Sequence, residues 1–193
     1  MTTIFIIHGA YGSPQENWIP WLQRELERDG HTVFAPQFPT PERQSLSSWM
    51  KVMKKYEKNI DEETIFVAHS IGTAFVLHVL ESLQKPIRAA ILVSPFISPL
   101  GEKRFDSINK TFYTTFDWKR IKENCKIFVL FHSDNDPYVP AEKALEVAER
   151  LDKVIIVISK AGHFNAAAGY TQFPLLLKHI EKLCQKKKIK KRI

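Results

Sequence analysis

Six short runs of β-branched and aromatic residues constrain the fold of this 193-residue chain more than any other feature of its sequence. These runs are residues 4–7, 32–35, 64–68, 89–93, 127–131 and 154–158. None of them alternates polar with apolar residues, so each is predicted to be a strand that is buried on both faces, as in a parallel sheet. Because helical patterns separate the runs, the sequence predicts a three-layer α/β/α domain with a mostly parallel six-stranded sheet.

Apolar stripes with helical spacing lie between the runs and predict the helices that cover the sheet. Gly30 ends the first stripe, and Pro140 precedes the third, which are positions typical of helix ends and helix starts. We assign the aromatic and methionine residues of these stripes to the core rather than to a cofactor site. The stripes are Trp18, Trp21, Leu22 and Leu26; Leu46, Trp49, Met50, Met53 and Ile60; Ala144, Leu145, Ala148 and Leu151; and Phe173, Leu176, Leu177, Ile180 and Leu183.

The formal net charge of +7 is concentrated at the C-terminus. Six of the 28 basic residues lie there, which leaves 22 basic against 21 acidic residues in the rest of the chain. A uniformly basic surface for specific nucleic-acid binding is therefore not indicated. We expect one domain over residues 1–184 and a basic tail over residues 185–193. The tail is interpreted as a solvated end, with contact to an anionic surface as the alternative. The six basic residues are Lys186, Lys187, Lys188, Lys190, Lys191 and Arg192.

The expected location is the cytoplasm. The apolar run near the N-terminus is too short for a signal peptide, and no apolar stretch approaches membrane-spanning length. Cys125 and Cys184 are far apart and lack a metal-binding spacing, so both are predicted to be free thiols in a reducing compartment.

A nucleophilic serine is predicted at Ser70, directly after the third run. The flanking residues Ala68 and Gly72 are small, and a wholly apolar helical segment follows. A strand, a serine and a buried helix with no loop between them are typical of the nucleophile elbow, in which a strained turn exposes the serine Oγ. The pattern G-x-S-x-G is altered here because Ala68 replaces its first glycine. The alternative is a serine that only caps a buried helix.

The turn after the first run contains His8, Gly9, Ala10 and Gly12. It matches neither G-x-G-x-x-G nor the phosphate-binding P-loop, which argues against nucleotide binding. We predict instead that the backbone N–H of Ala10 forms an oxyanion hole together with the N–H of Ile71. A plain tight turn is the alternative.

The loops after the fifth and sixth runs supply candidate partners for the serine. Asp134 and Asp136 follow the fifth run, and either carboxylate is able to orient a histidine. His132, Asp134 and Asp136 together also suggest a metal site, which would leave the serine unused. His163 follows the sixth run after a glycine, so that its imidazole is free to point at the serine. The chain order of serine, aspartate and histidine is that of α/β-hydrolases.

These segments together resemble the family of small serine hydrolases related to bacterial YdeN and retinoblastoma-binding protein nine. The resemblance covers about residues 3–183 and implies a trimmed α/β-hydrolase fold. It implies Ser70 as nucleophile, Asp136 rather than Asp134 as acid, and His163 as base. The basic tail has no expected counterpart, and no L-x-C-x-E peptide is present, so retinoblastoma protein binding is not implied. The segments that carry the resemblance are His8-Gly9, Asn17-Trp18, residues 68–72, residues 133–140 and residues 162–165.

The expected function is hydrolysis of a small ester or related acyl substrate through Ser70, His163 and Asp136, without a metal or an organic cofactor. The alternative is a binding protein on a hydrolase scaffold. Residues 94–124 carry several aromatic side chains, which either cover the site and line an acyl pocket or pack onto the core.

Overall fold

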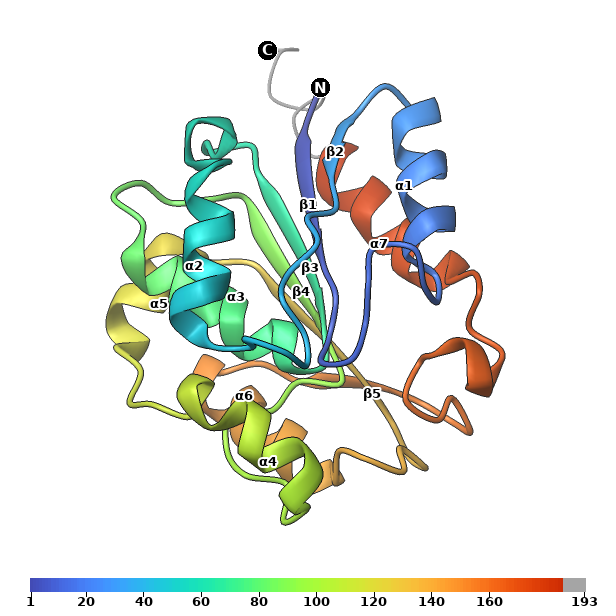
Figure 1. Ribbon diagram of the computed structural model, residues 1–193. Coiled ribbons are helices and arrows are strands. Elements are labelled where there is room, and N and C mark those ends of the chain that lie inside the picture. Colours follow the sequence, from blue (N-terminus) through green and yellow to red (C-terminus); the bar gives the residue numbers. More distant parts are fainter. Residues whose placement is uncertain (186–193) are drawn as a thin grey trace.

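The computed structural model describes residues 1–185 and contains one six-stranded sheet in the order β2-β1-β3-β4-β5-β6 (Figure 1). Every neighbouring pair is parallel, which confirms the expected α/β architecture. The strands are β1 (Thr3–Ile7), β2 (Thr32–Phe34), β3 (Ile65–His69), β4 (Ala89–Val93), β5 (Phe128–Ser133) and β6 (Ile155–Ile158).

The central strands are buried on both faces because helices pack on each side of the sheet. Every residue of β3 and β4 is buried. The expectation of burial on both faces is wrong for β6, which lies at an edge of the sheet. Val157 of this strand is 61% exposed. Val154, which is 87% exposed, lies outside the strand. The sequence pattern gave no sign of this because an apolar run does not reveal on how many sides it is covered.

The helices form two layers (Figure 1). On one face, α1 (Ile19–Arg28) and α7 (Pro174–Gln185) pack against the sheet in a cluster that contains Trp18, Leu22 and Ile180. On the other face lie α2 (Leu46–Lys54), α3 (Ile71–Ser82), α5 (Trp118–Asn124) and α6 (Ala141–Leu151). Ile60, placed by its spacing on the second helix, instead follows a separate 3-10 turn, η1 (Glu57–Asn59).

The segment between β4 and β5 uses its aromatic residues in both of the expected ways. It contains α4 (Lys103–Asn109), η2 (Lys110–Phe112) and α5. Phe112 is fully buried in the core cluster of α2 and α3, whereas Phe105 lines a pocket at the strand ends. Core packing therefore anchors this segment and leaves α4 at the pocket wall.

The order of the strands determines where a site can form. The chain passes from β1 to β2 on one side and then crosses back to β3 on the other side of β1. In parallel α/β sheets, the loops at the carboxyl ends of the strands diverge at such a point and leave room for a ligand. The loops after β1 and β3 carry Ala10 and Ser70, so two predicted site residues lie beside this crevice.

Within residues 1–185, no helix has both the length and the apolar character needed to cross a membrane. The predicted basic tail lies outside the described residues, apart from Gln185, the last residue of α7.

Candidate active site

Ser70 lies between the last residue of β3 and the first residue of α3, with φ 58° and ψ −131°. A positive φ is rare for a residue with a side chain, so the turn is strained as an elbow requires. Two glycines make room for it. A Cβ on Gly72 would lie 2.6 Å from the carbonyl oxygen of His8, and one on Gly9 would lie 2.8 Å from Cβ of Ser70. The elbow therefore packs directly against the end of β1.

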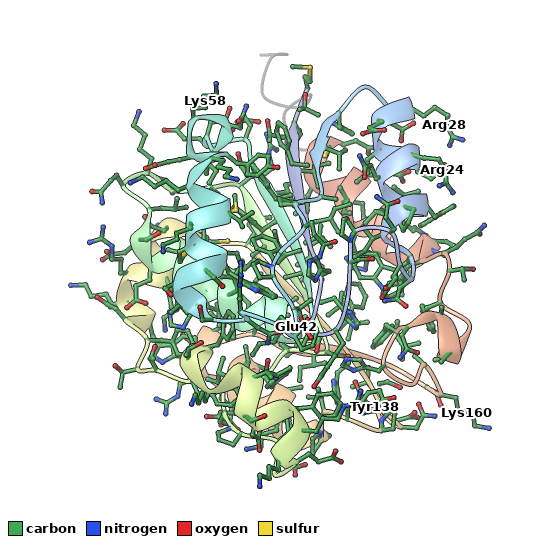
Figure 2. All side chains as sticks on the ribbon, viewed as in Figure 1. Arg24, Arg28, Glu42, Lys58, Tyr138 and Lys160 are labelled. Carbon is green, nitrogen blue, oxygen red and sulfur yellow. The ribbon has the colours of Figure 1, made fainter. Side chains whose placement is uncertain are left out.

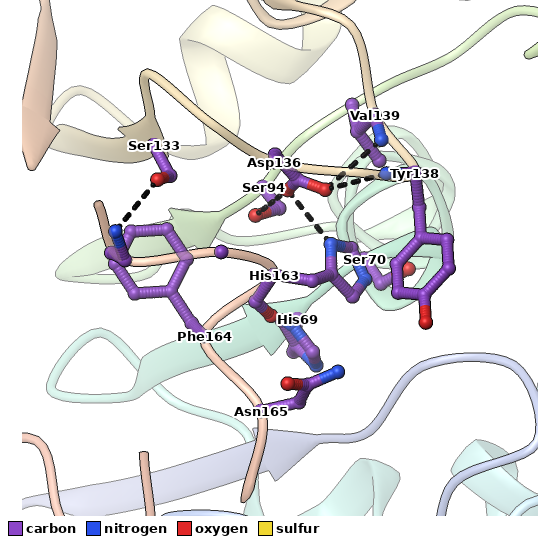
Figure 3. Close-up of polar contacts among 12 residues, drawn as sticks. His69, Ser70, Ser94, Ser133, Asp136, Tyr138, Val139, His163, Phe164 and Asn165 are labelled. Atoms are coloured by element: carbon purple, nitrogen blue, oxygen red, sulfur yellow. Dashed lines mark hydrogen bonds and ion pairs between the residues drawn. The ribbon is translucent and has the colours of Figure 1, made fainter. Parts of the chain in front are cut away.

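Asp136 and His163 are in direct contact. Asp136 Oδ2 lies 2.8 Å from Nδ1 of His163, and the Asp136 side chain is fully buried (Figure 3). A carboxylate accepts hydrogen bonds, so Nδ1 carries the proton and Nε2 is left with a free lone pair. This is the tautomer that a general base needs.

The Asp136 carboxylate accepts hydrogen bonds from three further groups. The Ser94 hydroxyl donates to Oδ2 at 2.8 Å, and the N–H groups of Tyr138 and Val139 donate to Oδ1 at 3.0 and 3.1 Å (Figure 3). Burial raises the pKa of Asp136, but its hydrogen bond to His163, the charge of that ring and the two N–H groups together lower the pKa below its ordinary value. Asp136 is therefore kept ionised and in a fixed position.

Asp134, the other candidate acid, does not contact His163. Its Oδ1 accepts a hydrogen bond of 2.7 Å from the N–H of Lys160. This bond lowers the pKa of Asp134, helped by a bond from the Ser159 side chain. Asp134 thus connects the acid loop, residues 133–139, to the histidine loop, residues 159–166.

Side chains from the acid loop and from the segment before α1 hold the backbone of the histidine loop. Ser133 Oγ accepts from the N–H of Ala161 at 3.0 Å, and Asn135 Oδ1 accepts from the N–H of Gly162 at 2.8 Å. From the segment before α1, Trp18 Nε1 donates to the carbonyl of Phe164 at 3.0 Å, and Asn17 Oδ1 accepts from the N–H of Ala166 at 2.8 Å. His163 is therefore presented by a loop that is fixed on both sides.

Two buried histidines support the site without contacting Asp136. His69 Nε2 donates to the carbonyl of His163 at 2.8 Å, and burial together with the charge of His163 lowers the pKa of His69 to about 3. His8 accepts from the N–H of Phe38 at Nε2 and donates from Nδ1 to the carbonyl of Gly9. Burial lowers the pKa of His8 as well. Both rings are neutral hydrogen-bonding supports.

The predicted oxyanion donors are the N–H groups of Ala10 and Ile71. Neither N–H donates to another group within residues 1–185. The carbonyl of Gly9, in the same peptide unit as the Ala10 N–H, accepts from His8 Nδ1 at 2.8 Å and from the N–H of Gly12 at 3.3 Å. These bonds fix the orientation of that peptide plane. Ile71 is the first residue of α3, where an N–H has no partner inside the helix.

One pocket of about 240 Å³ joins these groups. Ala10, Ser70 and His163 line it, whereas Asp136 lies behind His163 and the buried Ile71 side chain does not reach it. Among residues 1–185, Ser70 Oγ and His163 are not hydrogen-bonded, although both face the pocket; catalytic contacts often tighten only with substrate bound. In Figure 2, Tyr138, another lining residue, lies in the lower half of the molecule, away from Lys58 at the top.

The metal alternative at His132, Asp134 and Asp136 has no geometric support. The part of the chain that the structure describes contains no group of three or more His, Cys, Asp or Glu side chains arranged to hold a metal ion. Asp134 and Asp136 instead bond to Lys160 and His163.

Sequence reasoning missed Ser94 and the side chains that hold the histidine loop. Ser94 follows β4 directly, and this position at the carboxyl end of a strand could have identified it as a candidate site residue. Ser133 and Asn135 lie next to the candidate acids but show no motif of their own. Their partners come from the following strand end, which only the fold brings close.

Sequence similarity to known proteins extends over most of the chain. The sequence model of a family described as "Serine hydrolase" matches residues 4–182. YdeN of Bacillus subtilis (strain 168) is 30% identical over 175 residues, which cover 90% of this chain and 91% of YdeN. Serine hydrolase RBBP9 of Rattus norvegicus is 33% identical over 149 residues, which cover 77% of this chain and 78% of RBBP9.

Solved structures show the same fold. The crystal structure of the ydeN gene product from B. subtilis has a TM-score of 0.88 at 28% identity and covers 95% of this chain and 98% of its own. Est1E from Butyrivibrio proteoclasticus has a TM-score of 0.72 at 18% identity, covering 96% of this chain and 87% of its own, a likeness of fold alone.

Proposed function

Because the chain belongs to the serine hydrolase family, we propose that it hydrolyses small carboxylic esters through Ser70, His163 and Asp136. The observation that carries the proposal is the 2.8 Å hydrogen bond between His163 Nδ1 and Asp136 Oδ2, beside a pocket that Ser70 and His163 both line. A buried, ionised carboxylate on a histidine whose second nitrogen is free provides a general base next to a strained serine.

In the proposed reaction, Ser70 Oγ attacks the ester carbonyl carbon while His163 Nε2 takes the hydroxyl proton. The tetrahedral intermediate collapses, the bond to the alcohol oxygen breaks, and His163 returns its proton to that oxygen. Water then attacks the acyl-serine in the same way and releases the carboxylic acid and free Ser70. Asp136 stabilises the charged ring through Nδ1–H without taking up the proton itself.

The oxyanion of each intermediate is proposed to bind the N–H groups of Ala10 and Ile71. In support, both donors lack a partner within the described chain, and the bonds of the Gly9 carbonyl orient one of them. A single preorganised donor of this kind is worth about 3 kcal/mol in the transition state.

The proposed substrate is small. The pocket volume of about 240 Å³ lies below the roughly 300 Å³ at which pockets for drug-sized ligands begin. Phe96, Leu100 and Phe105 supply an apolar wall that suits a short acyl or alcohol group.

A fluorophosphonate probe and a series of p-nitrophenyl esters of graded chain length test the proposal. We expect wild-type protein to react with the probe and to cleave the short esters fastest. Ser70→Ala should abolish both reactions and leave the circular dichroism spectrum unchanged. Ser82→Ala, at the exposed far end of the same helix, is the control and should behave like wild type. Labelling or turnover that survives Ser70→Ala within tenfold of wild type would contradict the assignment.

A further inference from the structure

The pocket that Ser70 and His163 line contains one guanidinium group. Arg104 of α4 is the only lysine or arginine among the described residues that line it, and Glu16 is the only carboxylate. The reaction proposed above uses neither of them. A charged side chain in the wall of a small pocket affects which substrates bind there.

Two aromatic rings pack against Arg104, an exposed residue that lines the pocket. Its Cζ atom lies 4.8 Å from the ring centroid of Tyr11 and 5.5 Å from that of Phe105, both within cation–π distance. The Tyr11 N–H is bound to Thr40 Oγ1 at 2.7 Å. The Phe105 ring contacts those of Tyr11 and Tyr138, with centroids 6.1 and 5.6 Å apart. These ring contacts favour a position of the guanidinium at the pocket wall and leave its N–H donors available.

No acid of the described chain neutralises Arg104, since none of the salt bridges among residues 1–185 includes it. Asp106, two positions further along α4, accepts hydrogen bonds from the N–H groups of Leu100 and Gly101 and from the Tyr113 hydroxyl. That carboxylate is therefore engaged elsewhere. An arginine at a pocket wall that contacts aromatic rings and has no acidic partner among the described residues offers its planar N–H donors to a carboxylate ligand.

We propose that Arg104 binds an anionic group of the substrate, so that the preferred esters carry a carboxylate on their acyl or alcohol part. This inference rests on the proposed esterase function and names its substrate class. Glu16 would favour the opposite charge, but no side-chain contact of Glu16 within residues 1–185 holds its carboxylate in place. Arg104, whose guanidinium contacts two aromatic rings, is therefore the charge that we expect to determine the preference.

Two pairs of esters, matched in shape and different in charge, test the inference. The charge lies on the acyl part in p-nitrophenyl hydrogen adipate, whose neutral partner is p-nitrophenyl 5-carbamoylpentanoate. It lies on the alcohol part in 4-butyryloxybenzoate, whose neutral partner is 4-butyryloxybenzamide. For at least one pair, wild type should show a higher kcat/KM for the anion, mainly through a lower KM. This preference should weaken with added salt.

Arg104→Gln should lower kcat/KM for the preferred anion by about tenfold or more, as expected when a hydrogen bond to a charged group is lost. The kcat/KM of the same variant for the neutral ester of that pair should change less than twofold. Arg104→Lys, which keeps the positive charge, should retain part of the preference for the anionic ester. Lys103→Gln is the matched control because Lys103 is exposed on the same helix and does not line the pocket. Lys103→Gln should leave kcat/KM unchanged for both the anionic and the neutral ester.

Three results would overturn the inference. One is an equal loss for anionic and neutral esters in Arg104→Gln, which would indicate a structural role only. Another is the absence of any preference in wild type. The third is a preference for the cationic ester p-nitrophenyl 6-aminohexanoate that Glu16→Gln removes. If wild type cleaves none of these esters, the proposed function itself fails. Ser70-dependent cleavage without charge preference refutes only the role of Arg104.

Discussion

At the scale of single residues, the Asp136 carboxylate is the most fully determined group of the site. It is completely buried, and four donors from the residues His163, Ser94, Tyr138 and Val139 surround its two oxygens. A buried charge is stable only when it is satisfied in this way. Its neighbour in sequence, Asp134, is exposed and holds a loop together instead.

The two aspartates give a direct test of the predicted acid. Asp136→Asn should lower kcat by several orders of magnitude, since an amide at this position favours the wrong tautomer of His163. Asp134→Asn should keep most of the activity and lose at most about 1 kcal/mol of stability, because the amide oxygen still accepts from Lys160. Steady-state kinetics and urea unfolding of both variants check this, and the reverse ranking of activities would contradict the assignment.

The neutral state of His69 predicts how stability depends on pH. Its pKa is about 3 in the folded protein against 6.5 ordinarily, so the folded state binds fewer protons than the unfolded chain between these values. Stability should therefore fall as the pH drops from about 6.5 toward 3, by at most about 1.4 kcal/mol per pH unit from this group.

Urea unfolding of wild type and His69→Gln between pH 7.5 and 4.5 measures this slope. The variant should be less stable at pH 7.5, because it loses its ring contact with Trp18, but should show a flatter pH dependence. His179→Gln, which changes a less buried histidine, should keep most of the slope. Equal slopes in wild type and His69→Gln would show that His69 is not the titrating group.

At the scale of elements, the acid loop and the histidine loop form one hydrogen-bonded unit beyond the ends of β5 and β6. Ser133, Asp134 and Asn135 accept in turn from the N–H groups of Ala161, Lys160 and Gly162. His163 follows immediately. A small shift of this backbone would move His163 relative to Ser70, so we expect these bonds to affect the proposed reaction through the position of His163.

Comparison of two asparagines separates this effect from stability. Asn135→Ala removes the bonds that Asn135 Oδ1 accepts from the Gly162 N–H and the Ser133 hydroxyl at an exposed site, and should lower kcat/KM by about tenfold with little loss of stability. Asn124→Ala removes two bonds, to the carbonyls of Leu80 and Leu83, at a buried site away from the pocket. It should cost about 1–3 kcal/mol of stability and leave kcat/KM unchanged. If both variants lose activity only in proportion to stability, the loops do not position His163.

The strands and the elbow could be predicted from the sequence, whereas the hydrogen bonds between the loops could not. Apolar runs identify the strands, because burial on both faces leaves a local pattern, and glycine and serine identify the elbow. The bond from Trp18 to Phe164 joins positions 146 residues apart, and that from Ser94 to Asp136 joins positions 42 apart. Neither bond has a local pattern, since each depends on two loops that meet only after the sheet has formed. The exposure of β6 likewise depends on its place at the sheet edge.

At the scale of the whole molecule, the proposed reaction uses only groups within residues 1–185, while six of the basic charges lie beyond them. A chain ending at residue 185 should therefore hydrolyse neutral p-nitrophenyl esters within about twofold of the full chain, since changes away from the packed core usually matter little.

Co-sedimentation with vesicles of anionic lipid, at low and at physiological salt, tests whether the tail has a separate role. If it binds such surfaces, only the full chain should sediment, and less so as salt is added. A large loss of esterase activity on truncation would contradict the proposal that the domain is complete by residue 184.

The all-parallel sheet also determines when the site can come into existence. Its parts follow β1, β3, β5 and β6, so the first and last of them, Ala10 and His163, are far apart in the chain. During synthesis, the elbow is made long before the loop that carries His163, the proposed base. Parallel strands pair only through distant contacts, which form slowly. A partly folded or nascent chain that lacks β6 therefore also lacks the loop with the proposed base, and recovery of esterase activity should be among the last signals to appear on refolding.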